Sequence, residues 1–199
     1  MRSIHLLTAV SAAALLVACG GDPGRGDLKE ASTLVTTLTA AQLDAATAAS
    51  GLQAVSGKAK CDVRVVAINY LTPGVKGEMS NASGVVLLPS GTAAECSGPL
   101  PLLAYARGTE VSKVRTLANP TDGETALLSA VYAAQGYAVV ATDYLGFAKS
   151  EHSFHPYLHA DSEASAVIDS IRAARLTAVG FNANLSGKVM VSGYSQGGH

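Results

Sequence analysis

The residues best suited to chemistry lie near the carboxyl end of the 199-residue sequence, where Gly193-Tyr194-Ser195-Gln196-Gly197 has the pattern G-x-S-x-G. A serine hydroxyl becomes a nucleophile when it stands on a sharp turn from a strand into a helix. Gly193 and Gly197 would let such a crowded turn close, because they carry no side chain. The backbone N–H of Gln196 would then stabilise negative charge on the oxygen of the reacting carbonyl. A chance serine in a glycine-rich turn gives the same pattern, so the context of the motif decides its meaning.

The segments around this motif predict an α/β fold. Residues 188–192 (KVMVS) come directly before the motif and are typical of a buried strand. The predicted strands at residues 62–70 and 83–89 form an antiparallel hairpin, and the strands after them alternate with helices. This alternation indicates a mostly parallel sheet, with the motif at the carboxyl end of a strand. The other predicted strands cover residues 62–70, 83–89, 100–106 and 137–142, and the predicted helices cover 121–136 and 161–176.

The first residues are typical of a bacterial export signal. An apolar run over residues 4–17 is shorter than the stretch of about 20 residues that spans a bilayer. Residues 16–19 (LVAC) resemble a lipobox, in which the signal is removed before a cysteine that then carries lipid. We therefore expect a lipoprotein signal peptide over 1–18, a cell-envelope lipoprotein attached to the membrane through Cys19, and a tether with a short helix over 19–55. A secreted protein with an ordinary signal peptide is the alternative.

Composition and cysteine content argue against a nucleic-acid-binding protein and against a zinc site. Only 15% of the residues are charged and the formal net charge is −1, so the chain lacks the excess of lysine and arginine that binds nucleic acid. Besides Cys19, the sequence contains two cysteines, Cys61 and Cys96. Two cysteines so far apart do not make a zinc site. The predicted hairpin brings the start of its first strand beside the end of its second, so we expect a Cys61–Cys96 disulfide and no metal.

Together the motifs resemble the N-terminal half of an α/β-hydrolase of the bacterial secretory lipase and esterase type, over about residues 62–199. The resemblance implies a serine carboxylic-ester hydrolase that acts on a small-molecule or lipid ester without a cofactor. It also implies that the backbone N–H of Gln196 and the turn at Gly108 and Thr109 hold the oxyanion. The family often has histidine where this chain has Arg107, and we expect this difference to alter the charge of the pocket. The matching segments are YSQGG at 194–198, ARGT at 106–109, TDYLG at 142–146 and HPYL at 155–158.

A serine hydrolase of this fold also needs a histidine base and an acid, and both follow the serine in chain order. Only four residues follow Ser195, so we interpret residues 56–199 as the N-terminal part of a hydrolase domain, truncated and inactive by itself. Asp143 precedes the serine and is expected to support a loop, and His199 is expected to be structural. The histidines within residues 152–159 indicate a polar loop rather than a metal site. A non-catalytic surface lipoprotein on the same scaffold is the alternative function.

Overall fold

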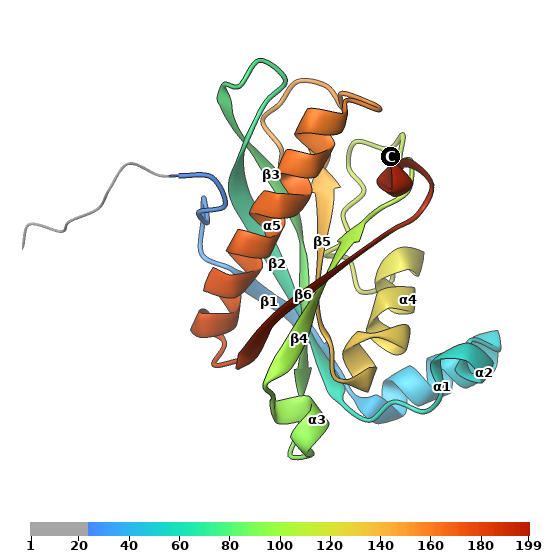
Figure 1. The fold of residues 1–199 in the computed structure, drawn as a ribbon. Helices are drawn as coiled ribbons and strands as arrows, with labels where there is room; N and C mark the ends of the chain where they lie inside the picture. Colours follow the sequence, from blue (N-terminus) through green and yellow to red (C-terminus); the bar gives the residue numbers. More distant parts are fainter. Residues whose placement is uncertain (1–23) are drawn as a thin grey trace, which may run out of the picture.

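The computed structural model describes residues 24–199, which form one mixed sheet with helices on both faces (Figure 1). The expected signal peptide and Cys19 lie outside these residues. Within residues 24–199, no helix combines the length and apolar character needed to cross a membrane. The elements are β1 (Thr33–Leu38), α1 (Ala40–Ser50), α2 (Gln53–Ser56), β2 (Asp62–Pro73), β3 (Met79–Ser90), α3 (Ala94–Ser97), β4 (Leu100–Ala106), α4 (Gly123–Val131), η1 (Ala133–Gln135), β5 (Ala138–Tyr144), α5 (Ala160–Gly180), β6 (Leu185–Gly193) and the short 3₁₀ helix η2 (Ser195–Gly198).

The strands follow the order β1-β2-β3-β5-β4-β6 across the sheet. β2 and β3 form the predicted antiparallel hairpin, in which Asp62 lies opposite Ser90 and Pro73 lies opposite Met79. β2, β4, β5 and β6 run in one direction, whereas β1 and β3 run in the other. The α/β class and the predominance of one strand direction are therefore confirmed. β6, which leads into the G-x-S-x-G motif, is the last strand at one edge.

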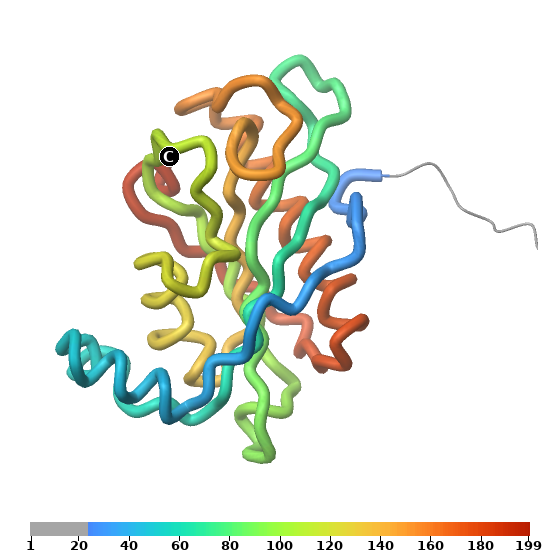
Figure 2. The backbone as a smooth tube through the Cα atoms, turned by 180° about the vertical axis from the view of Figure 1, so that it is seen from behind, coloured from blue at the N-terminus to red at the C-terminus, as the bar shows by residue number. Residues whose placement is uncertain are grey.

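Each face of the sheet has its own apolar core. Neighbouring residues of β2 point to opposite faces, so that Val65 belongs to the core beneath α4 and Val66 to the core beneath α5. On the α4 side the cluster includes Leu128, and on the α5 side it includes Ala173. Figures 1 and 2 show α5 on one face of the sheet and α1, α2 and α4 on the other. This double covering explains why the sequence is rich in apolar residues and poor in charge.

Residues 24–38 are packed against the domain, which corrects our expectation of a tether before the short helix. Arg25 pairs with the buried carboxylate of Asp169 at 3.1 Å, and Leu28 forms a β-bridge with Tyr70. Residues 33–38 (TLVTTL) then add strand β1 to the edge of the sheet beside β2. β-branched residues favour strands, but this short run stands in a stretch rich in alanine and threonine, which hid it. The short helix expected in this region is present as α1.

The structure contains a Cys61–Cys96 disulfide, with the two Cα atoms 5.4 Å apart. Cys61 comes directly before β2, and Cys96 lies in α3 directly after β3. The hairpin therefore brings the two cysteines together, as the sequence predicts. Both are buried, and the bridge closes a loop of 35 residues at the end of the sheet opposite to the G-x-S-x-G motif.

Candidate active site

Ser195 lies on a tight turn that directly follows β6. Its φ angle is 53°, a left-handed conformation that residues other than glycine rarely adopt and that is often found at functional sites. A Cβ atom on Gly193 would lie 2.0 Å from the carbonyl oxygen of Gly197, and one on Gly197 would lie 1.9 Å from that of Ala106. Neither position can hold a side chain, so both glycines are needed for the turn to close against the end of β4. This is the geometry expected of a nucleophile elbow.

The turn that follows β4 packs directly beside the elbow. The N–H of Tyr194 donates to the carbonyl of Ala106 at 3.2 Å, and a Cβ atom on Gly108 would meet the ring of Tyr194 at 3.0 Å. Thr109 and Ser195 both line a cavity of about 550 Å³. The structure thus brings together the serine and the turn expected to hold the oxyanion, which are far apart in the sequence.

The backbone N–H of Gly108 already donates to the carboxylate of Glu124, at 3.3 Å. The expectation that Gly108 itself holds the oxyanion is therefore weakened, since its donor is engaged. The backbone N–H groups of Thr109 and Gln196 remain as candidate donors.

Comparisons with known proteins agree with this geometry. Residues 110–199 match the secretory lipase family. The structure superposes on the rice cell wall degrading esterase LipA from Xanthomonas oryzae with a TM-score of 0.79 and 46% sequence identity. The chain has an α/β-hydrolase fold. The resemblance inferred from the sequence motifs is thereby confirmed.

Two further structures are similar to this chain. A Legionella pneumophila protein described as a candidate hydrolase has 26% identity and a TM-score of 0.75, over 85% of this chain and 44% of its own. Candida antarctica lipase A, at 19% identity and a TM-score of 0.53, shares the fold. The alignment with LipA covers 89% of this chain and 44% of LipA, so the chain spans less than half the length of that esterase. Among curated proteins, none gives a significant match.

Arg107 lies in the turn that follows β4, and its side chain is inside the protein. Its side chain is fully buried, and its guanidinium lies 3.0 Å from Glu110, 3.5 Å from Glu124 and 3.8 Å from Asp143. A buried cation needs such carboxylate partners, because leaving water is costly for an uncompensated charge. Our expectation that Arg107 alters the charge of the pocket is therefore wrong, since its charge is balanced within the protein.

Asp143, at the end of β5, has the supporting role that the sequence indicates. Its buried carboxylate accepts hydrogen bonds from the N–H of Leu117 at 2.7 Å and from the hydroxyls of Ser83 and Thr116 at 2.7 and 2.8 Å. Burial raises the pKa of Asp143, and these hydrogen bonds oppose that rise. The residue ties the loop between β4 and α4 to the centre of the sheet.

Glu110, in the turn that follows β4, is a carboxylate whose ionised form is strongly stabilised by its neighbours. Burial opposes its ionisation, but the N–H of Ser112, the guanidinium of Arg115 and the N–H of Val111 together lower the pKa of Glu110 to about 2. Arg107 adds a further favourable charge. Glu110 therefore stays ionised well below the pH at which an ordinary glutamate takes up a proton.

Replacing Glu110 with glutamine should destabilise the fold at neutral pH but hardly at pH 2. Because the folded pKa lies below the ordinary value of 4.5, the ionised group stabilises the fold above that value, and this stabilisation is lost as the pH falls to about 2. The shift corresponds to at most about 3 kcal/mol. Urea denaturation of the two proteins between these pH values measures the effect, with exposed Glu95→Gln as the control. A loss that stayed constant with pH would contradict this explanation.

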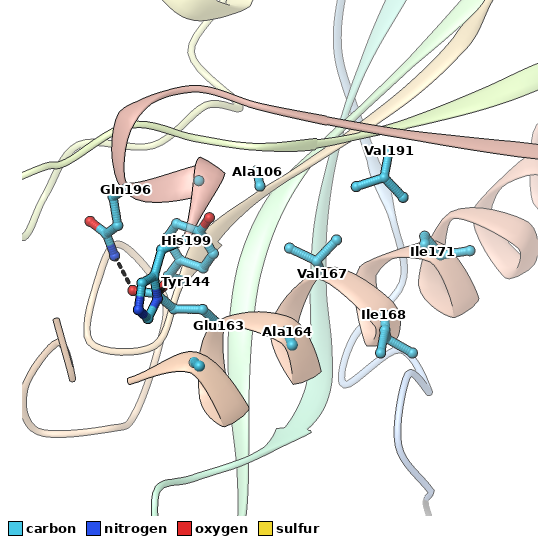
Figure 3. Close-up of a pocket in the computed structure, with 12 residues that line it drawn as sticks. Ala106, Tyr144, Glu163, Ala164, Val167, Ile168, Ile171, Val191, Gln196 and His199 are labelled. Carbon is cyan, nitrogen blue, oxygen red and sulfur yellow. Dashed lines mark hydrogen bonds and ion pairs between the residues drawn. The ribbon is translucent and has the colours of Figure 1, made fainter. Parts of the chain in front are cut away.

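The side chain of Gln196 is the part of the site that sequence analysis missed, since only its backbone N–H was assigned a role. Its amide is buried between Glu163 of α5 and His155 of the loop before α5. Figure 3 shows Gln196 joined to Glu163 at one end of a cavity of about 310 Å³ between α5 and β6. Apolar residues such as Val167 and Val191 line the rest of this cavity. Sequence could not show this cluster, because its members come from three separate segments.

No group of three or more histidine, cysteine, aspartate or glutamate side chains in residues 24–199 is arranged to hold a metal ion.

Proposed function

We propose that this chain carries the nucleophile and the oxyanion hole of a serine carboxylic-ester hydrolase of the carboxylesterase or lipase type. The observation that carries the proposal is that Ser195, in a strained turn, and Thr109 line one cavity. Ser195 Oγ attacks the ester carbonyl, and the N–H groups of Gln196 and Thr109 stabilise the oxyanion that forms. The secretory lipase family and the 46% identity to an esterase support an ester as substrate, either a small molecule or a lipid.

The histidine base and the acid of the triad are proposed to come from residues outside the 199-residue sequence. Each of the four histidines in the described residues has a partner other than Ser195. β6 also forms an exposed edge in the described part of the chain, with Val191 67% exposed, which supports a longer domain. We expect the 199 residues alone to have no substantial esterase activity and to fold poorly, because such an edge promotes aggregation. The side-chain partners of the four histidines are Glu78 for His152, Gln196 for His155, Ser162 for His159 and Glu163 for His199.

The protein is further proposed to be exported and held at the bacterial cell envelope by lipid on Cys19. The match to a family of secretory lipases supports export. The proposal of lipid attachment rests on the lipobox-like residues 16–19.

Labelling with a fluorophosphonate tests the proposed function directly. The full-length gene product, with all residues that its gene encodes after His199, should react through one serine, and mass spectrometry should locate the label on Ser195. Such a probe reacts with a serine only when a base and an oxyanion hole activate it. Ser195→Ala should abolish labelling. An unlabelled but folded protein would instead favour the non-catalytic surface lipoprotein.

A further inference from the structure

The side chain of Gln196 is the buried part of an otherwise exposed turn. Gln196 is 3% exposed, whereas the preceding Tyr194 is 69% exposed and Ser195 is also exposed. A buried amide requires hydrogen-bond partners. Glu163 and His155, 33 and 41 residues away in the sequence, supply them. The residue after the candidate nucleophile is therefore anchored to the protein through its side chain.

The hydrogen bonds of this cluster determine where its protons lie. Gln196 Nε2 is 2.7 Å from His155 Nε2 and also forms a short hydrogen bond with Glu163 Oε1. The amide nitrogen has two protons, so it donates one to each partner. His155 Nε2 is therefore an acceptor without a proton. His155 Nδ1 lies 2.9 Å from the carbonyl oxygen of Leu145, which can only accept, so Nδ1 carries the proton of a neutral imidazole.

Glu163 fixes the orientation of the Gln196 amide. Its Oε1 atom also accepts the N–H of Leu158 at 3.1 Å, and its Oε2 atom lies 3.5 Å from His199 Nδ1. Rotating the amide by half a turn would place Gln196 Oε1, which has no partner among the described residues, against the carboxylate. Two oxygen atoms that can only accept hydrogen bonds repel each other there. Only one orientation of the amide is therefore compatible with an ionised Glu163.

His155 is held by aromatic rings as well as by hydrogen bonds. Its ring packs against Phe147 and Tyr144, with centroid distances of 4.6 and 5.8 Å, and Tyr157 lies edge-on at 6.3 Å. The titratable groups around His155 are the phenols of Tyr144 and Tyr157, Glu163 beyond the Gln196 amide, and Glu110 and Lys113, which line the same cavity as His155. Both the position and the tautomer of the imidazole are set by these surroundings.

We propose that Glu163, the Gln196 side chain and His155 form a clamp that positions the oxyanion hole. The clamp fixes the peptide between Ser195 and Gln196, whose N–H is the second oxyanion donor, so this inference rests on the proposed function and deepens it. An oxyanion donor must lie about 2.7–3.1 Å from the charged oxygen, and a misplacement of about 1 Å can lower a rate about 100-fold. Glu163 and His155 act through Gln196 and are positioning residues.

Exchanging the amide and the carboxylate tests the clamp in the full-length gene product. Gln196→Glu alone places two carboxylates together, and it should lower kcat about 100-fold while KM stays within about twofold. Adding Glu163→Gln restores an amide-to-carboxylate hydrogen bond with its direction reversed, while the hydrogen bond from the N–H of Leu158 is lost because that N–H then faces an amide nitrogen. His155 Nε2 must then donate, so the double variant needs a protonated imidazole, whereas the wild type needs a neutral one.

The pH dependence of the double variant supplies the deciding measurement. The ratio of its kcat to that of the wild type should be at least about tenfold higher at about pH 5.5 than at about pH 8, because the double variant needs a proton on His155 Nε2 that the wild type does not need. Dividing by the wild-type kcat at each pH removes the part of the pH dependence that the two enzymes share. Gln135→Glu, in η1 with its amide bonded to the carbonyl of Lys58, is the matched control and should leave kcat unchanged. A ratio that did not change with pH would overturn the clamp.

Nitrogen NMR of His155 in the Ser195→Ala protein provides a second test that needs no activity. At about pH 8 the clamp requires a proton on Nδ1 and none on Nε2. A proton on Nε2 would overturn the proposal even if the variants failed to fold. Hydrolysis that persisted undiminished in Ser195→Ala would refute the proposed function instead, and the NMR result would still report on the clamp.

Discussion

Replacing Ser195 with alanine should lower kcat/KM for a short-chain nitrophenyl ester by at least about 10,000-fold in the full-length protein. Ser195 stands in a left-handed turn in which neither flanking glycine could carry a side chain, and it shares a cavity with Thr109. Removing the hydroxyl removes the covalent step, while the oxyanion donors and substrate binding keep a small residual rate. Initial rates of nitrophenol release measure the effect.

The control for this experiment is Ser186→Ala, a serine on the same strand β6 but at its opposite end. It should hydrolyse the ester at the wild-type rate. If Ser195→Ala retained more than about one tenth of the wild-type activity, another group would be the nucleophile, and the elbow geometry would have a purely structural cause.

Replacing Arg107 with methionine should lower the free energy of unfolding by about 3–5 kcal/mol. Arg107 is fully buried among the carboxylates of Glu110, Glu124 and Asp143. Removing the cation leaves Asp143 without its ion pair, and it leaves Glu110 and Glu124 with Arg115 as their one remaining cation in a poorly hydrated environment. The cost of this lost compensation exceeds the value of the pair itself. The loss is a large fraction of the total stability of an ordinary domain. Urea denaturation of the oxidised protein at neutral pH measures it.

Arg175→Met provides the matched control, because Arg175 lies on the exposed face of α5 and has no ion pair among the described residues. Its effect on the free energy of unfolding should stay within about 0.5 kcal/mol. A similarly small effect of Arg107→Met would show that Glu110 and Glu124 are compensated by Arg115 alone. In that case the buried cation would not be what stabilises the oxyanion turn.

The sequence by itself determined the parts of this protein that depend on local signals. A β-branched, apolar run before G-x-S-x-G indicates a strand that leads into a tight turn. The turn needs glycine at both positions, because an added Cβ atom would lie 2.0 or 1.9 Å from a backbone carbonyl oxygen. The β2–β3 hairpin follows from two such runs joined by a glycine-containing turn. Backbone conformation can be inferred here because the residues that cause it are neighbours in the chain.

The tertiary structure alone decided which distant groups meet. Strand β1 was hidden in sequence because its pairing with β2, rather than a strong local pattern, stabilises it. The three carboxylates around Arg107 come from the turn after β4, from α4 and from the end of β5. Gln196 likewise meets Glu163 and His155 only after α5 packs on the sheet. Buried polar groups take their partners from whatever the fold brings near, so their roles depend on packing across long sequence separations.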